Sequence, residues 1–168
     1  ARIESPDARL DCYDDLFRVE RDVVRSAAPN GVWQVQTEKS RIDDSNNVYM
    51  HLRSSEEEVG RYGRPVRFSI WIACRENTTS LWINFGGHFM SDHRTGTVTY
   101  RIDDNPAQRR AFRESNDHEA LGLWTGGRSI PFVKSLFGAS RLLIRATPYS
   151  ESTLETEFPI AGIENAVK

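Results

Sequence analysis

From residue 32 onward the sequence alternates between apolar and polar residues in short runs, and this period of two constrains the fold more than any other feature. Such runs, rich in Val, Ile, Thr and aromatic residues, are typical of antiparallel strands with one buried face. The runs are VWQVQTEKS, NVYMHLRS, RPVRFSIWIAC, TSLWINFGG, GTVTYRID, RLLIRATPY and STLETEFPI, and the last two form a hairpin. We therefore expect a mainly β (α+β) fold, either an antiparallel β-sandwich or a curved sheet, with about eight strands.

The run RFSIWIAC shows how the two faces of a strand differ. Neighbouring side chains in a strand point to opposite sides of the sheet. The inner set is Phe68, Ile70, Ile72 and Cys74, and the outer set is Arg67, Ser69, Trp71 and Ala73. RENTTS then joins this strand to the next as a hairpin loop, and the second strand turns its own apolar set inward: Leu81, Ile83 and Phe85. We expect these two strands to pair.

Two segments follow a helical period instead. Residues 6–27 carry apolar residues every three to four positions, which predicts an amphipathic N-terminal helix packed on the sheet. SIPFVKSLFGA predicts a short helix before the last hairpin, capped by Ser129 and stopped by Gly138. The polar stretch before Leu123 shows no clear pattern. We expect one domain over residues 1–168, with a helical N-terminal segment over 1–28 and a β-rich body over 32–168.

Charge and reactive side chains exclude several classes of function. The 22 basic and 24 acidic residues are scattered along the chain, so no surface for nucleic acid is expected. No apolar run approaches the roughly 20 residues of a membrane span. The two cysteines and four histidines lack the spacing of a zinc site, and no nucleophile motif such as GxSxG occurs. We expect no metal, no cofactor and no enzymatic activity. An enzyme would require His88 and His93, which flank one loop, to meet an acid.

The two cysteines are 62 positions apart, and their surroundings favour a disulfide. Cys12 lies near the apolar edge of the N-terminal helix, so it comes within reach of Cys74 if that helix crosses the inner face of the sheet. In the chain-entropy model a loop of this length stabilises the fold by roughly 4 kcal/mol. Such a bond persists in the periplasm or outside the cell. The alternative is two reduced, buried cysteines in a cytosolic protein.

Three side chains are candidates for a binding surface. Trp124 lies in a glycine-containing loop and is expected to be an exposed anchor. Arg101 and Arg145 fall on the polar faces of their strands, where they could help to bind a small molecule or glycan. The alternative for both arginines is a solvated or ion-paired sheet face. At least one of the tryptophans within the strands is expected in the core: Trp33, Trp71 or Trp82.

Several motifs occur in a fixed order over nearly the whole chain. They are ARIESPDARLDCYDDL, WQVQTEKSRIDDSNNVYMHL, FSIWIACRENTTSLWINF, VTYRIDDNPA and SIPFVKSLFGASRLLIRATPYSESTLETEFPIAGIENAV. In this order they resemble the TagO/VasI family of type VI secretion accessory proteins. The resemblance implies a bacterial envelope protein that is exported by a signal peptide, later removed, and that has no established catalytic activity. It also implies that Cys12 and Cys74 occupy the cysteine positions of the family.

These observations lead to one expected function and one alternative. We expect a non-enzymatic periplasmic accessory or interaction protein whose partners are other envelope or secretion-apparatus proteins. The alternative is a periplasmic module that binds a small molecule or cell-wall glycan. Function inferred from a family resemblance remains an analogy until a site supports it.

Overall fold

A computed structural model describes residues 33–42, 44–91 and 94–166. The strands of the first half are β1 (Gln34–Lys39), β2 (Asn46–Arg53), β3 (Glu58–Val59), β4 (Pro65–Val66), β5 (Ser69–Arg75) and β6 (Thr78–Asn84). The second half contains β7 (Thr95–Ile102), β8 (Gln108–Glu114), β9 (Ala120–Leu123), α2 (Gly126–Ser135), β10 (Leu142–Ala146), β11 (Leu154–Phe158) and α3 (Ile163–Ala166). The predicted helix over residues 6–27 and Cys12 lie outside the described residues.

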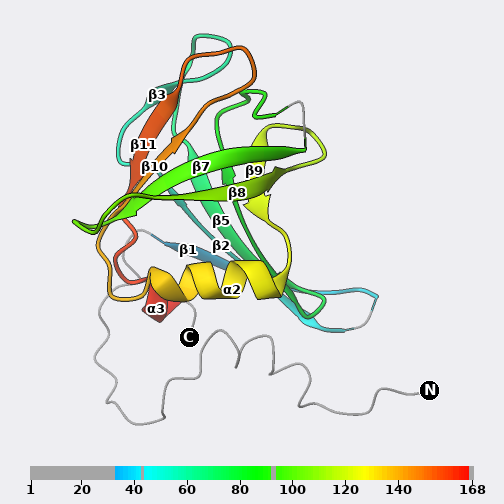
Figure 1. The fold of residues 1–168 in the computed structure, drawn as a ribbon. Coiled ribbons are helices and arrows are strands. Elements are labelled where there is room, and N and C mark those ends of the chain that lie inside the picture. The colour runs from blue at the N-terminus through cyan, green and yellow to red at the C-terminus, as the bar shows by residue number, and fades with distance from the viewer. Residues whose placement is uncertain (1–32, 43, 92–93, 167–168) are drawn as a thin grey trace.

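Nine of these strands form one antiparallel sheet in the order β1-β2-β5-β6-β9-β8-β7-β10-β11, and β3 pairs only with β4. The sheet curves strongly, so that β7 and β8 cross over β2 and β5 (Figure 1). The backbone N–H of Ser55, just after β2, donates to the carbonyl of Glu157 in β11 at 2.8 Å. This bond links the two halves of the curved sheet. The mainly β, antiparallel prediction is confirmed, and the observed form is one large curved sheet with the small β3–β4 sheet as a separate pair.

The core fills the concave side of this sheet. Its largest fully buried rings are Phe68, Phe85, Phe112, Phe132 and Phe158. Each such ring stabilises the fold by about 1.5–3 kcal/mol through removal of apolar surface from water. The rings come from both halves of the sheet and from α2, so the core joins the two halves. The inward positions predicted for Leu81, Ile83 and Phe85 are confirmed, since all three are buried.

The hairpin of β5 and β6 is present in the predicted place. Trp71 lies opposite Trp82, and Ala73 lies opposite Ser80. On the inner face, Cys74 is half-buried near the end of β5. Its predicted partner is not among the described residues, so the disulfide remains a prediction.

Two features of the second half differ from the sequence expectation. The unassigned polar stretch contains β8 and β9, and β9 lies between β6 and β8 in the middle of the sheet. The helix before the last hairpin begins at Gly126, three residues before the predicted cap, and Thr125 is its N-cap. Ser129 is instead buried within the helix, where its hydroxyl donates to the carbonyls of Thr79 and Thr125. Contact with β6 therefore allows a serine inside the helix.

Candidate functional site

Four aromatic rings lie in a row across the outer face of the sheet. His51 of β2, Trp71 of β5 and Trp82 of β6 are opposite one another in register. The His51 and Trp71 rings stack with centroids 4.1 Å apart, and the Trp71 and Trp82 rings stack at 5.8 Å with only 4° between their planes. Trp124, just after β9, stacks on Trp82 at 5.8 Å. We call these four residues the aromatic ladder.

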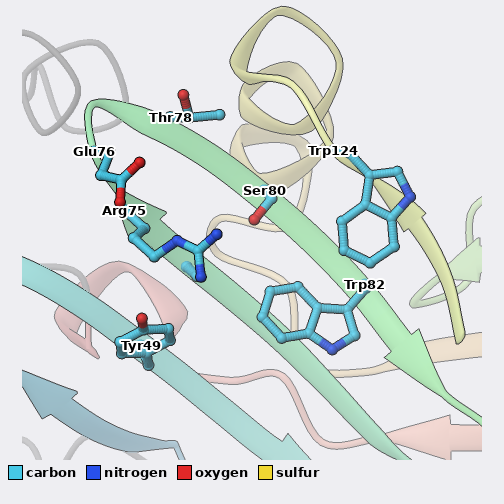
Figure 2. Close-up of a pocket in the computed structure, with 8 residues that line it drawn as sticks. Tyr49, Arg75, Glu76, Thr78, Ser80, Trp82 and Trp124 are labelled. Carbon is cyan, nitrogen blue, oxygen red and sulfur yellow. The ribbon is translucent and has the colours of Figure 1, made fainter. Parts of the chain in front are cut away.

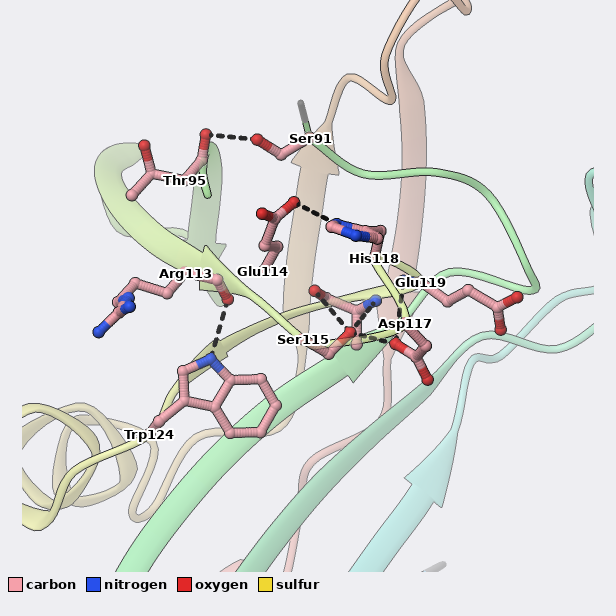
Figure 3. Close-up of polar contacts among 10 residues, drawn as sticks. Ser91, Thr95, Arg113, Glu114, Ser115, Asp117, His118, Glu119 and Trp124 are labelled. Atoms are coloured by element: carbon pink, nitrogen blue, oxygen red, sulfur yellow. Dashed lines mark hydrogen bonds and ion pairs between the residues drawn. The ribbon is translucent and has the colours of Figure 1, made fainter. Parts of the chain in front are cut away.

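Trp124 reaches the ladder because Gly122 has no side chain. Gly122 lies opposite Trp82, and a Cβ at this position would be 2.6 Å from Cε2 and Cζ2 of the Trp124 ring. The ring therefore occupies the space that a side chain of β9 would fill. Its indole N–H donates to the carbonyl of Arg113 in β8 at 3.1 Å, as Figure 3 shows. These contacts fix the position of Trp124.

The loop between β8 and β9 holds these two strands in register. The backbone N–H of Ser115 donates to the carbonyl of Ala120 at 2.9 Å, and the Ser115 hydroxyl accepts the N–H of Ala120 at 3.0 Å. The same hydroxyl donates to the carboxylate of Asp117 (Figure 3), which is the largest cause of a lowered Asp117 pKa. This closed loop places Gly122 opposite Arg113. The hydrogen bonds of this loop therefore help to position Trp124, although the loop itself is not part of the ladder.

The three tryptophans of the ladder are half-buried, whereas Trp33 is in the core with 4 % of its surface exposed. The Trp71 indole N–H donates to the hydroxyl of Ser69 at 3.0 Å. Within the described residues, no hydrogen bond reaches the indole N–H of Trp82. The expectation that at least one strand tryptophan is in the core is confirmed by Trp33. The other two strand tryptophans form a half-exposed aromatic surface, the kind of surface found at binding sites.

A hollow of about 340 Å³ lies beside the Trp82 and Trp124 end of the ladder. The residues that line it include Ser80 and Ala73, and Ala73 is only 3 % exposed. Figure 2 shows Tyr49 on the side opposite Trp82 and the Arg75 guanidinium directed into the space between them. The hollow therefore combines aromatic walls with one cation. We call it the Arg75 hollow.

The opposite end of the ladder has a different electrostatic character. Burial, and secondly the nearby charge of Arg53, lower the pKa of His51. This shift favours the neutral form of the imidazole, which stacks on Trp71. A wider hollow of about 480 Å³ adjoins this end, and Arg53, Arg67 and Glu57 are among the residues that line it.

Arg101 and Arg145, the other two predicted binding residues, are not beside Trp124. They line a small hollow of about 180 Å³ on β7 and β10, away from the ladder. Arg145 forms an ion pair with Glu155 at 2.5 Å, and Arg101 donates to the carbonyl of Asn105 at 3.0 Å. The structure thus separates Trp124 from the two arginines and shows both arginines already engaged with neighbours.

His88, one of the two histidines that flank a loop in the sequence, connects separate segments of the fold. His88 is buried, with Nδ1 2.5 Å from the carboxylate of Glu151 and Nε2 2.9 Å from the carbonyl of Val59. Both ring nitrogens therefore face acceptors on other segments, so His88 ties three segments together. His93 lies outside the described part of the chain. A second histidine, His118, pairs with Glu114 at 2.9 Å (Figure 3). Among the described residues, no group of three or more His, Cys, Asp or Glu could hold a metal ion.

Most of the ladder was not predicted as a site. The sequence identified Trp124 as an anchor and placed Trp71 on the outer face, but it did not join these residues to His51, Tyr49 or Arg75. One signal was present: a hairpin closed by RENTTS aligns Trp71 with Trp82 on the same face. Two tryptophans opposite each other on the outer face of a hairpin indicate a surface feature, because core rings would point inward.

Fold and site together define a mainly β protein with a half-exposed aromatic face. A family model described as "Type VI secretion system VasI, EvfG" matches residues 1–168. The chain belongs to this VasI family of the type VI secretion system, and the resemblance seen in the sequence motifs is confirmed.

Two further comparisons were with solved structures and with curated proteins. The crystal structure of invasion associated protein B from Bartonella henselae is similar, with a TM-score of 0.53 and 16% sequence identity, over 82% of this chain and 88% of that chain. This likeness shows a shared fold. A comparison with curated proteins finds no match. In the described segments, no helix has the length and apolar character that crossing a membrane requires.

Proposed function

We propose that the chain is a non-enzymatic interaction protein of the bacterial periplasm that serves type VI secretion, and that the aromatic ladder contacts another envelope protein. The observation that carries this proposal is the row of three tryptophans held half-exposed by Gly122 and by strand register. Protein interfaces are enriched in tryptophan, tyrosine and arginine, and all three border the Arg75 hollow. Family membership supports the association with secretion machinery.

The non-enzymatic part of the proposal is supported by the contacts of His88, the described histidine of the loop singled out in the sequence. Both ring nitrogens of His88 are occupied by Glu151 and by a backbone carbonyl, which leaves neither free to move a substrate proton. The periplasmic part is supported by the predicted disulfide and by the family resemblance.

A glycan partner is the alternative, and membership of the VasI family favours a protein of the secretion machinery. A sugar ring binds by placing its C–H groups against the flat face of an aromatic ring. The Trp82 ring lies beside the Trp124 ring rather than directly beneath it (Figure 2), with centroids 5.8 Å apart, so a flat indole face is available next to the Arg75 hollow. This availability is the observation that keeps the glycan alternative open to the retention test below.

Crosslinking in the native envelope, followed by mass spectrometry, tests the proposed function. We expect the chain to be recovered with a protein of the secretion machinery. The matched control is the same cells without crosslinker, in which the neighbour should be absent. Recovery of no protein neighbour, together with specific retention of the chain on isolated cell-wall glycan, would replace the proposal with the glycan alternative.

A further inference from the structure

We propose that the Arg75 hollow is a carboxylate-binding site that takes an acidic side chain or a C-terminal carboxylate of a peptide segment. This inference rests on the proposed function, because it specifies the chemistry that the partner presents to the ladder. It depends on three observations: the unpaired cation, the surroundings of its guanidinium, and the charge at the rim.

The first observation is that Arg75 has no partner among the described residues. It is exposed at the end of β5 and makes no ion pair, even with its neighbour Glu76. Some other arginines are engaged: Arg145 of β10 pairs with Glu155, and Arg141, just before β10, pairs with Asp104. The hydrogen-bonding capacity of the Arg75 guanidinium is therefore free, and a planar guanidinium matches a carboxylate through two parallel hydrogen bonds.

The second observation is where the guanidinium points. Figure 2 shows it directed into the hollow, toward the space bounded by Tyr49, Ser80 and Trp82. The Ser80 hydroxyl lies on the same side and has no hydrogen-bond partner within the described residues, so it can add a second donor. The ring carbons of Trp82 offer apolar contact to the carbon atoms that carry the carboxylate. A ligand with a carboxylate at the end of a short apolar stem fits this arrangement.

The third observation is the charge at the rim. Glu76 lines the same hollow as Arg75, so the two formal charges of the site sum to zero. The hollow therefore offers no net positive charge that would favour a multiply charged anion, and binding depends on directed hydrogen bonds. A planar carboxylate matches the planar guanidinium through two parallel hydrogen bonds. The hollow of about 340 Å³ is at the lower end of the usual range of ligand pockets, which is large enough for a side chain or a chain end.

The test is an NMR titration of the isotopically labelled full chain with short peptides. One tetrapeptide, blocked at both ends, carries a single aspartate after a leucine. A second has asparagine in place of the aspartate, and a third has no charge except a free C-terminal carboxylate. We expect saturable shifts at the backbone amides of Ala73 and Ser80 with either carboxylate peptide and none with the asparagine peptide. A response to only one carboxylate peptide would identify its source as the side chain or the chain end.

Three variants test whether peptide binding depends on the charges of the Arg75 hollow. Arg75→Gln should weaken binding of the responding peptide about tenfold or more, because a charge-assisted pair is lost. Glu76→Gln should strengthen it, by roughly two- to fivefold, because a repelling charge is removed. Arg53→Gln, at the opposite end of the ladder, should leave it unchanged. Equal shifts with the asparagine peptide, or unchanged binding to Arg75→Gln, would overturn the inference.

Failure of this inference is distinguishable from failure of the proposed function. If a crosslinked protein neighbour depends on the ladder but no carboxylate peptide binds, the carboxylate site is wrong and the interaction role stands. If carboxylate peptides bind but no protein neighbour is recovered from the envelope, the site is correct and the interaction role is not.

Discussion

Removal of the predicted Cys12–Cys74 disulfide is expected to lower the free energy of unfolding by about 4 kcal/mol. The bond would close a loop of 62 positions and attach the N-terminal segment to the end of β5. Cys74 is half-buried between Val48 of β2 and Thr79 of β6, in the middle of the first half of the sheet. The unfolded chain gains the most freedom when such a long loop is opened.

The measurement is chemical or thermal unfolding of the full chain with and without reductant. Reduction should lower the melting temperature by roughly 8–16 °C, given the usual 2–4 °C per kcal/mol for a domain of this size. The double variant Cys12→Ser, Cys74→Ser is the matched control and should unfold at the same temperature in both conditions. Labelling of two free thiols in the protein purified from the periplasm would show that the disulfide is not formed.

Replacement of Trp82 by alanine is expected to weaken the protein neighbour's affinity by roughly 30-fold or more, as the loss of a central interface residue does. Trp82 stacks on both Trp71 and Trp124, so its removal interrupts the ladder and takes away one wall of the Arg75 hollow. The ring is on the outer face and only half-buried, so the core between the sheet halves remains packed. Affinity for the crosslinked neighbour is measured with purified proteins.

A second variant separates the arrangement of the rings from their presence. Gly122→Ala keeps all the tryptophans but places a Cβ 2.6 Å from the Trp124 ring, so this ring must leave its position. We expect the affinity to fall in the same direction as for Trp82→Ala. Tyr62→Ala is the control, because Tyr62 is an aromatic residue with 82 % exposure in the turn between β3 and β4. A fall in affinity for Tyr62→Ala equal to that for Trp82→Ala would refute a specific role for the ladder.

Much of the fold followed from the period of two. The outer and inner sets of β5 and β6 were predicted because strong alternation, β-branched residues and a short polar connection occur together there. β9 was missed because ALGL is short and buried at all four positions, so no alternation marks it as a strand. β8 was missed because only Phe112 of its seven residues is buried, which resembles a polar loop in sequence.

The site was harder to predict than the fold because it depends on register between strands that are distant in sequence. Trp71 and Trp82 are joined by a hairpin and could have been aligned. His51 joins them only because β2 pairs with β5, and Trp124 joins only because the missed strand β9 pairs with β6. Gly122 leaves room for the Trp124 ring, and this role could not be predicted without knowing where that ring lies. Arg101 and Arg145 lie on exposed positions as alternation indicated, but position along a strand does not reveal an ion-pair partner such as Glu155.

The central claim is that the ladder face touches a partner protein, and site-specific photocrosslinking in living cells tests it most directly. A photoreactive phenylalanine analogue replaces Thr78, an exposed residue at the rim of the Arg75 hollow, or replaces Tyr62 as the control. We expect a discrete crosslinked protein from position 78 and none from position 62. Crosslinks from position 62 alone would contradict the claim and place the contact on another face.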